Sequence, residues 1–303
     1  MVAPVYRFPF RAMASPCEIR LAAPDAHIAG QVAREAIADV QGIEADYSRY
    51  RADSIVSRIN AAAGRDFVEC DDVACQLLAY ADHLYRTSDG LFDITSGVLR
   101  RAWDFRQPRL PDPAVLAATR ALVDWPSVRR VGRHVMLPRA GMEIDFGGFG
   151  KEYAADRAAA LLLRRGIRHG YVNLGGDMRF LGPQPDGQPW QIGIQDPRDP
   201  EGIAASIAVS QGALATSGDY ERYIEVGGRR YCHILNPRTG MPVSHWRSVS
   251  VLAPLAVLAG SVSTIAMLKE EGALPFLAAS GASWFAIDGA GATYHHKVSG
   301  EYA

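Results

Sequence analysis

The chain has 303 residues, a formal net charge of −1 and 48% hydrophobic residues, which is the composition of an ordinary globular protein. This composition excludes a disordered, fibrous or collagen-like chain, and the length is sufficient for a substantial hydrophobic core. Because nucleic-acid-binding proteins normally carry a basic excess, the balanced charge argues against a nucleic-acid partner.

Cysteine usage and the terminal residues predict a cytoplasmic protein. The four cysteines are Cys17, Cys70, Cys75 and Cys232. They contain no C-x-x-C pair, which favours free thiols in a reducing compartment. Residues 1–11 hold no long apolar stretch, so we expect no signal peptide, and a periplasmic location only if a leader has been removed from the natural sequence. The most apolar run, residues 249–268, is interrupted by Pro254 and Gly260, so we expect no membrane span.

The first half of the chain mixes short strands with amphipathic helices. Apolar residues recur at helical spacing across residues 26–46, and two aspartates open a helix expected over residues 71–88. Residues 143–146 read as a strand that leads into a helix over residues 151–165. The other elements expected here are a strand over 17–21, a short helix from 53 or 54 to 60, a surface loop over 106–113, and a hairpin of strands 128–131 and 134–137.

The second half consists mostly of strands joined by short turns. The expected strands are residues 171–174, 190–194, 203–209, 213–216, 220–226, 230–235 and 249–252, followed by a helix over 261–271 and a hairpin of 284–287 with 293–295. Few of these strands follow a strict strand–helix–strand alternation, which favours the α+β class over a doubly wound parallel sheet. We find no repeat or low-complexity linker, so we expect residues 1–303 to form one interleaved domain of mostly antiparallel or mixed sheets with packed helices.

A glycine-rich bend between a strand and a helix is the first candidate site. Gly147, Gly148 and Gly150 lie between the expected strand and the expected helix, and Lys151 follows them. Glycines let backbone amides approach a ligand, and the first turn of a helix presents unpaired N–H groups, so this bend can bind an anion. The pattern is neither a dinucleotide fingerprint nor a Walker loop, and it is equally typical of a tight turn.

Polar residues near His233 form a second candidate site. A lone histidine on a strand is usually structural, but this one lies between two polar turns, residues 216–219 and 236–240, which favours acid–base work. Residues 173–177 place two glycines after a buried strand, for which a bulge or turn with Asp177 as a cap is the more typical explanation.

Two further polar segments have both structural and functional interpretations. The hydroxyl-rich residues 260–264 are predicted at a helix start, where Ser and Thr act as N-caps; beside a phosphate they can also help to hold Mg²⁺. Residues 88–97 read as a helix stop and a turn, although Asp93 and Thr95 could equally meet a polar ligand.

Taken in order, these segments resemble the ApbE-like FAD:protein FMN transferase (flavin transferase) family. The matching stretches are residues 13–17, 47–50, 90–93, 145–156, 173–177, 216–220 and 233–240, so the resemblance covers most of the chain. It implies an ApbE-like α+β fold and an enzyme that binds FAD with Mg²⁺. Such an enzyme moves FMN onto a Ser or Thr hydroxyl of a target flavoprotein, within a D-x-x-S/T-G-A/S-T type of acceptor, and releases AMP.

The resemblance also implies roles for individual residues. His233 matches the base or orienting group. The positions that match cofactor-binding residues are Met13, Tyr50, Leu91, Phe92, Asp93, Gly147, Lys151, Tyr153, Asp156, Thr216, Ile234 and Thr239. The positions that match metal ligands are Gly150, through its carbonyl, Ser263 and Thr264.

Two departures from the family pattern bear on activity. Gly260 stands where the family has a metal-binding aspartate, and Glu152 stands where a glycine is usual. Loss of a carboxylate ligand should weaken Mg²⁺ binding, because hard cations prefer carboxylate oxygens. Three outcomes stay open: another acid such as Asp177 compensates, the protein binds FAD with weak or no transfer, or it hydrolyses FAD as a pyrophosphatase. Residues 93–99 resemble the acceptor pattern only in part, so self-modification is not expected.

Overall fold

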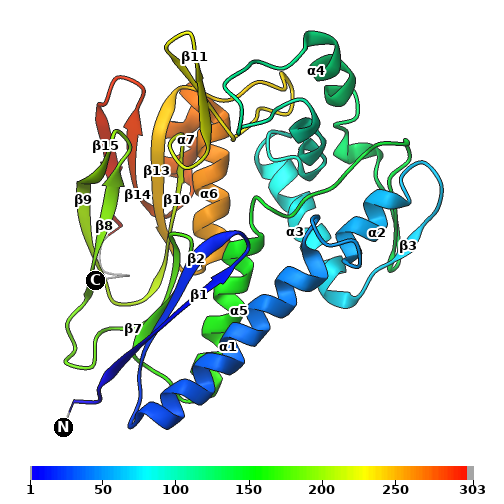
Figure 1. Ribbon diagram of the computed structural model, residues 1–303. Helices are drawn as coiled ribbons and strands as arrows, with labels where there is room; N and C mark the ends of the chain where they lie inside the picture. Colours follow the sequence, from blue (N-terminus) through cyan, green and yellow to red (C-terminus); the bar gives the residue numbers. More distant parts are fainter. Residues whose placement is uncertain (1, 299–303) are drawn as a thin grey trace.

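The computed structural model describes residues 2–298 and contains one large antiparallel sheet, with helices on one face and a mostly helical lobe beside it (Figure 1). The sheet has the order β1-β2-β6-β7-β10-β13-β14-β15, and every neighbouring pair is antiparallel. Its strands are β1 (Val5–Ala12), β2 (Ser15–Ala22), β6 (Gly170–Leu174), β7 (Asp177–Gly182), β10 (Gly212–Gly218), β13 (Trp246–Ala253), β14 (Ser283–Asp288) and β15 (Thr293–His296). The predicted α+β class is confirmed.

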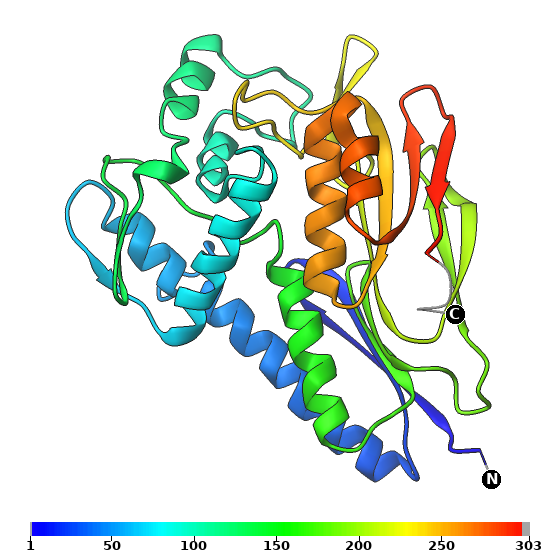
Figure 2. The same ribbon diagram turned by 180° about the vertical axis from the view of Figure 1, so that it is seen from behind.

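Three helices lie side by side on one face of the sheet, as Figure 2 shows: α1 (Ala26–Tyr47), α5 (Gly150–Arg164) and α6 (Ala256–Lys269). The buried stripes of α1 and α5 are rich in alanine, including Ala36 and Ala158. Because alanine has only a methyl side chain, these helices approach the sheet and one another closely. This close approach places the start of α5 beside α6.

The opposite face of the sheet is covered by a hairpin of β8 (Trp190–Asp196) and β9 (Asp199–Val209) (Figure 1). Neighbouring residues of one strand belong to different cores: Tyr171 packs with Trp190 of the hairpin, at 5.1 Å between ring centroids, whereas Val172 faces the helices. This two-residue alternation is what a sheet buried on both faces requires.

The lobe is formed by the chain between α1 and α5, together with a short hairpin from later in the sequence. It contains α2 (Ile55–Ala61), α3 (Asp72–Thr87), α4 (Pro113–Arg120), 3₁₀ turns at Ile94–Arg101 and Trp125–Ser127, and a three-stranded sheet of β3 (Val68–Glu69), β5 (His134–Met136) and β4 (Arg129–Val131). The later hairpin consists of β11 (Tyr223–Val226) and β12 (Arg229–Cys232), and the centroid of its Tyr231 ring lies 5.9 Å from that of the Trp103 ring of the lobe. The 3₁₀ turn Glu270–Gly272 and α7 (Ala273–Ala279) follow α6 and pack against it. One hydrophobic cluster joins Leu78 of the lobe to Val249 and Ile265 of the sheet and α6, so the two parts share a core.

Side-chain caps begin several helices where the sequence predicted. Asp71 caps α3 by accepting the Ala74 N–H at 2.6 Å, and Ser54 caps α2 by accepting the Ser57 N–H at 3.0 Å. Helix α6 differs, because it begins at Ala256 and not at residue 261. Its cap is Asp156 of α5, whose two carboxylate oxygens each accept a main-chain N–H from the start of α6 at 2.9 Å. The predicted N-cap role of residues 260–264 is therefore wrong, since these residues lie inside the helix.

Two further predictions differ from the structure. Residues 143–146 do not form a strand. The Asn60 side chain bonds both the N–H and the carbonyl of Ile144, at 2.7 and 3.0 Å, in place of a neighbouring strand. Asp177 begins strand β7 and is not a turn cap. Strands β1, β3 and β7 and helices α4 and α7 (Ala273–Ala279) were not predicted. Among residues 2–298, no helix is both long enough and apolar enough to cross a membrane.

Candidate active site

A cleft of about 2230 Å³ lies between the large sheet and the lobe, and it is lined by segments from all parts of the chain. Most of the predicted site residues line it: Met13, Tyr50, Leu91, Phe92, Asp93, Gly147, Gly150, Lys151, Thr216, His233, Ile234 and Thr264. Four predicted residues are not part of its lining: Tyr153, Asp156, Thr239 and Ser263. Ligand sites for drug-sized molecules occupy roughly 300–1,000 Å³, so this cleft has room for an extended dinucleotide and part of a second molecule.

Two hairpin tips form one wall of the cleft. Met13 and Ala14 join β1 to β2 with positive φ angles of 52° and 60°, a two-residue turn that non-glycine residues rarely adopt. Gly175 and Gly176 join β6 to β7 in the same way, at 65° and 99°. A Cβ on Gly175 would lie 2.8 Å from the Cβ of Ser15, so glycine lets the two tips touch.

The predicted glycine bend is held by side chains around it. Asp145 accepts the Gly147 N–H at 3.0 Å and forms an ion pair with Arg49. A Cβ on Gly148 would lie 2.7 Å from the ring of Phe92, so this glycine is required for packing. Helix α5 then begins without a side-chain cap, which leaves its positive end directed at the cleft for an anion.

A buried ion pair stands beside the start of α5. The Lys151 ammonium lies 2.6 Å from a carboxylate oxygen of Asp177, which is 5% exposed. Burial alone would lower the pKa of Lys151, but the Asp177 charge outweighs it and raises that pKa, so the ammonium stays charged. Lys151 therefore offers a permanent positive charge to the cleft.

Glu152 is the unexpected member of the site. It lines the cleft, is 6% exposed, and its Oε2 atom has no hydrogen-bond partner. Burial and the neighbouring Asp177 raise the pKa of this carboxyl well above its ordinary value. A Cβ on Gly260 of α6 would lie 2.5 Å from Oε1 of Glu152, so the glutamate side chain lies directly against this glycine. The sequence shows the unusual residues Glu152 and Gly260, but it does not show that they are in contact.

Hydroxyl groups gather where β10 meets α6. The Ser217 hydroxyl lies 2.8 Å from that of Ser263 and 3.0 Å from that of Thr264, and Ser263 also donates to the Gly260 carbonyl at 3.0 Å. Ser263 is fully buried, so Thr264 and Ser217 are the members of this cluster that line the cleft. Within residues 2–298 there is no group of three or more His, Cys, Asp or Glu side chains placed to hold a metal. A cation here would therefore depend partly on hydroxyl and carbonyl oxygens.

His233 follows β12 directly and is exposed in the cleft. Its main-chain N–H donates to the Arg222 carbonyl at 3.0 Å, and its ring Nδ1 lies 3.3 Å from the same oxygen. A protonated Nδ1 would donate to that carbonyl and leave Nε2 as the proton acceptor. Protein atoms around the ring shield it from water, which disfavours the charged imidazolium and lowers the pKa of His233 below its usual value. The positive charges of Arg222 and Lys151 lower this pKa further. The ring is therefore neutral at pH 7.

The predicted residues outside the cleft lining have partners elsewhere. The Tyr153 hydroxyl accepts from Arg157 at 3.1 Å, both oxygens of Asp156 cap α6, and Thr239 Oγ1 accepts the Met241 N–H at 3.1 Å. Their assignment to cofactor binding stays a prediction.

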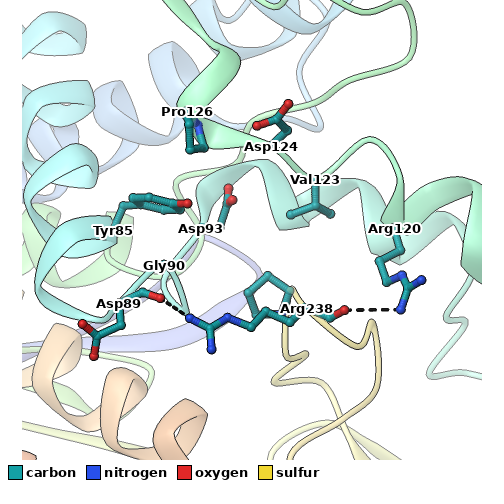
Figure 3. A pocket seen from close by; sticks show the side chains of 10 residues that line it. Tyr85, Asp89, Gly90, Asp93, Arg120, Val123, Asp124, Pro126 and Arg238 are labelled. Atoms are coloured by element: carbon teal, nitrogen blue, oxygen red, sulfur yellow. Dashed lines mark hydrogen bonds between the residues drawn. The ribbon is translucent and has the colours of Figure 1, made fainter.

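Asp93 lies at the boundary between the cleft and a smaller pocket of about 430 Å³. Its carboxylate accepts the Thr95 N–H at 2.7 Å and the Trp125 N–H at 3.3 Å, so it caps the 3₁₀ turn that follows. Figure 3 shows this pocket, where the Arg238 side chain reaches the main-chain oxygen of Asp89. These bonds give Asp93 a structural role that does not depend on a ligand.

Sequence reasoning missed three features of the site. Arg49 lies within a recognised segment, but its pairing with Asp145 could not be read from spacing. A Cβ on Gly218 would lie 2.3 Å from the Tyr220 ring, so glycine at this position makes room for that ring, which lines the cleft. Burial raises the pKa of Tyr220 to about 12, which keeps its hydroxyl protonated. The third is the contact between Glu152 and Gly260.

The cleft of this α+β fold combines an uncapped helix start, a lysine ammonium, a hydroxyl cluster and a neutral imidazole. These groups are typical of an enzyme site that binds an anionic ligand. A comparison with protein-family models matches residues 13–286 to the ApbE family, and the chain belongs to that family.

A comparison of sequences finds relatives named FAD:protein FMN transferase. An FAD:protein FMN transferase of Salmonella typhimurium is 32% identical over 72% of this chain, and one of Haemophilus influenzae is 29% identical over 78%. The matched region spans 65% of the Salmonella protein and 72% of the Haemophilus protein.

Solved structures show the same fold. The ApbE protein of Thermotoga maritima superimposes with a TM-score of 0.89 at 29% identity, covering 97% of both chains. The flavin transferase ApbE of Vibrio cholerae gives a TM-score of 0.86 at 25% identity, covering 98% of both chains.

Proposed function

We propose that this chain is an FAD:protein FMN transferase, which moves FMN from FAD to a Ser or Thr hydroxyl of a target flavoprotein and releases AMP. The observation that carries the proposal is the cleft itself, in which His233, Lys151 and the uncapped start of α5 line one space. Membership of the ApbE family and the names of the matched relatives support the same activity.

The reaction exchanges one phosphoester oxygen for another. The acceptor hydroxyl oxygen forms a bond to the phosphorus on the FMN side of the diphosphate, and the bond from that phosphorus to the bridging oxygen breaks. The electron pair of the broken bond leaves with AMP. His233 takes the hydroxyl proton, which its neutral ring can accept at pH 7.

The diphosphate of FAD carries negative charge that the site can hold. The Lys151 ammonium and the positive end of α5 act at the same corner of the cleft, where they stabilise charge on the phosphate oxygens. The ring of Tyr50 is 74% exposed at the cleft, with the Arg49 guanidinium 4.9 Å from its centroid. An exposed aromatic ring in a ligand cleft is suited to stacking on a flavin or adenine ring.

The oxygen-rich end of the cleft fits a Mg²⁺ ion. The donors are hard oxygens, and the unpartnered Oε2 of Glu152 is a buried carboxylate oxygen of the kind that a hard cation binds. We propose the Gly150 carbonyl and the Thr264 hydroxyl as ligands, because both residues line the cleft. Ser263 is buried outside the cleft lining and bonds the Ser217 hydroxyl at 2.8 Å, so its predicted role as a ligand is not part of this proposal. When bound, the ion would neutralise charge on the phosphates and lower the cost of transferring a phosphoryl group.

Incubation of the protein with FAD, Mg²⁺ and a target domain carrying a D-x-x-S/T-G-A/S-T segment tests the proposal. We expect a covalent adduct of FMN on the acceptor hydroxyl, found by mass spectrometry, and one AMP per adduct. A target with the acceptor Thr or Ser changed to Ala is the control and should gain no flavin. FMN and AMP formed without any acceptor would instead indicate a pyrophosphatase, and FAD binding without either product would leave a flavin-binding protein.

A further inference from the structure

Glu152 carries an unused carboxylate oxygen inside the cleft. The residue is 6% exposed, its Oε2 has no hydrogen-bond partner, and it is one of the residues that line the cleft. Removing an ionised carboxylate from water without a partner is strongly unfavourable, so buried carboxylates are normally paired or bound to a cation. An unpartnered oxygen at a ligand cleft therefore points to a group that binds there.

In the part of the chain that the structure describes, Glu152 is the one carboxyl group among its acidic neighbours that has no cation as a partner. Lys151 is the nearest cation, and its ammonium lies 2.6 Å from Asp177. Asp156, the other nearby acid, is paired with Arg179 at 3.1 Å. Each of these two carboxylates has its own cation, and Glu152 has none. A bound divalent cation would supply the missing charge.

The position of Glu152 also explains why residue 260 is glycine. A Cβ at residue 260 would lie 2.5 Å from Oε1, 2.6 Å from Cγ and 2.8 Å from Cδ of Glu152. The glutamate of α5 thus fills the space that any side chain at that position of α6 would need. Thr264 lies one helical turn further along α6, so the carboxylate and this hydroxyl share one end of the cleft.

We propose that Glu152 supplies the acidic ligand of a divalent-cation site in this cleft, from helix α5, in place of a side chain at position 260 on α6. The role of the cation in the reaction rests on the proposed function, whereas the binding of the cation does not. Glu152 and Gly260, the two departures from the family pattern, then form a single exchange. The carboxylate lies on α5 instead of α6. The chain therefore keeps an acid at this site.

Binding of Mn²⁺ alone, without FAD or acceptor, tests the proposal. Free Mn²⁺ is followed by electron paramagnetic resonance in the wild type, in Glu152→Gln and in the exchanged double variant Glu152→Gly/Gly260→Asp. We expect one Mn²⁺ per chain for the wild type, with affinity reduced about tenfold or more in Glu152→Gln. The double variant should bind Mn²⁺ within a few-fold of the wild type, because it returns a carboxylate to the same space.

A matched control separates ligation from general electrostatics. Glu221 also lines the cleft but is exposed, so Glu221→Gln makes the same change of charge nearby and should leave Mn²⁺ affinity within about twofold. Gly260→Asp alone should not improve binding, because its side chain would collide with Glu152. Glutamine has the shape of glutamate, so a residue that only fills space would tolerate Glu152→Gln without loss of Mn²⁺.

Two results would overturn the proposal. One is equal Mn²⁺ affinity of the wild type and Glu152→Gln, and the other is no Mn²⁺ bound by the wild type. Failure of FMN transfer by a wild type that does bind Mn²⁺ through Glu152 would count against the proposed function and leave the cation site in place. FMN transfer that persists while Glu152→Gln binds Mn²⁺ normally would count against this inference alone.

Discussion

Replacement of Gly260 by alanine is the most direct test of how tightly Glu152 packs against α6. The added Cβ would fall 2.5–2.8 Å from three atoms of Glu152, and two of them, Cγ and Cδ, are not the free end of the side chain. Overpacking of a buried site costs about 1–3 kcal/mol, whereas alanine in place of glycine inside a helix gains about 1 kcal/mol. The difference between these two effects predicts that Gly260→Ala lowers the free energy of unfolding by up to about 2 kcal/mol.

Gly42 provides the matched control on another helix. It lies within α1, and an added Cβ would meet nothing within 4 Å. Gly42→Ala should therefore gain up to about 1 kcal/mol from helix propensity. Urea unfolding followed by circular dichroism at pH 7 measures both variants.

A double-mutant cycle with Glu152 identifies the source of the loss. In a Glu152→Ala background the space beside Gly260 is free, so Gly260→Ala should become stabilising, with a coupling energy equal to the lost overpacking cost of about 1–3 kcal/mol. The reasoning is refuted if Gly260→Ala stabilises the wild type as much as Gly42→Ala does. It is equally refuted if the effect of Gly260→Ala is the same with and without Glu152.

Three further predictions concern His233, Asp156 and the Lys151–Asp177 pair. His233→Asn should reduce FMN transfer about 100-fold or more with little change in FAD affinity, whereas the same change at the exposed His83 should not. Because the pKa of His233 is lowered, its ring stays neutral as the pH falls below 6.5, so kcat/KM should hold between pH 7.5 and 6; a loss centred near pH 6.5 would contradict this. Asp156→Ala should lower the free energy of unfolding by about 2–3 kcal/mol, since it removes both capping bonds of α6 and the partner of Arg179, and an unchanged urea midpoint would contradict that role. Lys151→Met should cost about 2–3 kcal/mol by leaving Asp177 buried without its cation, and adding Asp177→Asn should recover at least half; no recovery would show that the pair is not the cause.

Local signals in the sequence determined much of the fold. The apolar residues of α1 recur at helical spacing, and Asp71 and Ser54 cap helices a few residues away, so both signals lie within one short window. The strands of the hairpins β4–β5, β11–β12 and β14–β15 were predicted because their turns are equally local. The glycine turns also indicated the main parts of the cleft, and with the order of the motifs they indicated the family.

Tertiary structure decided the features that depend on residues far apart in the chain. The cap of α6 comes from Asp156 on another helix, so the local serines gave the wrong start. Asn60 takes the place of a neighbouring strand for Ile144, which no pattern of alternation shows.

Glu152 and Gly260 show the same division at the candidate site. Each stood out in the sequence as an isolated substitution, and only the packing of α5 against α6 shows that the carboxylate of one fills the space left by the other. The physical reason is that periodicity and caps act within a few residues of the chain, whereas packing, ion pairs and ligand sites depend on distances in space. The sequence alone therefore determined which elements form, and the folded structure decided which of their side chains meet.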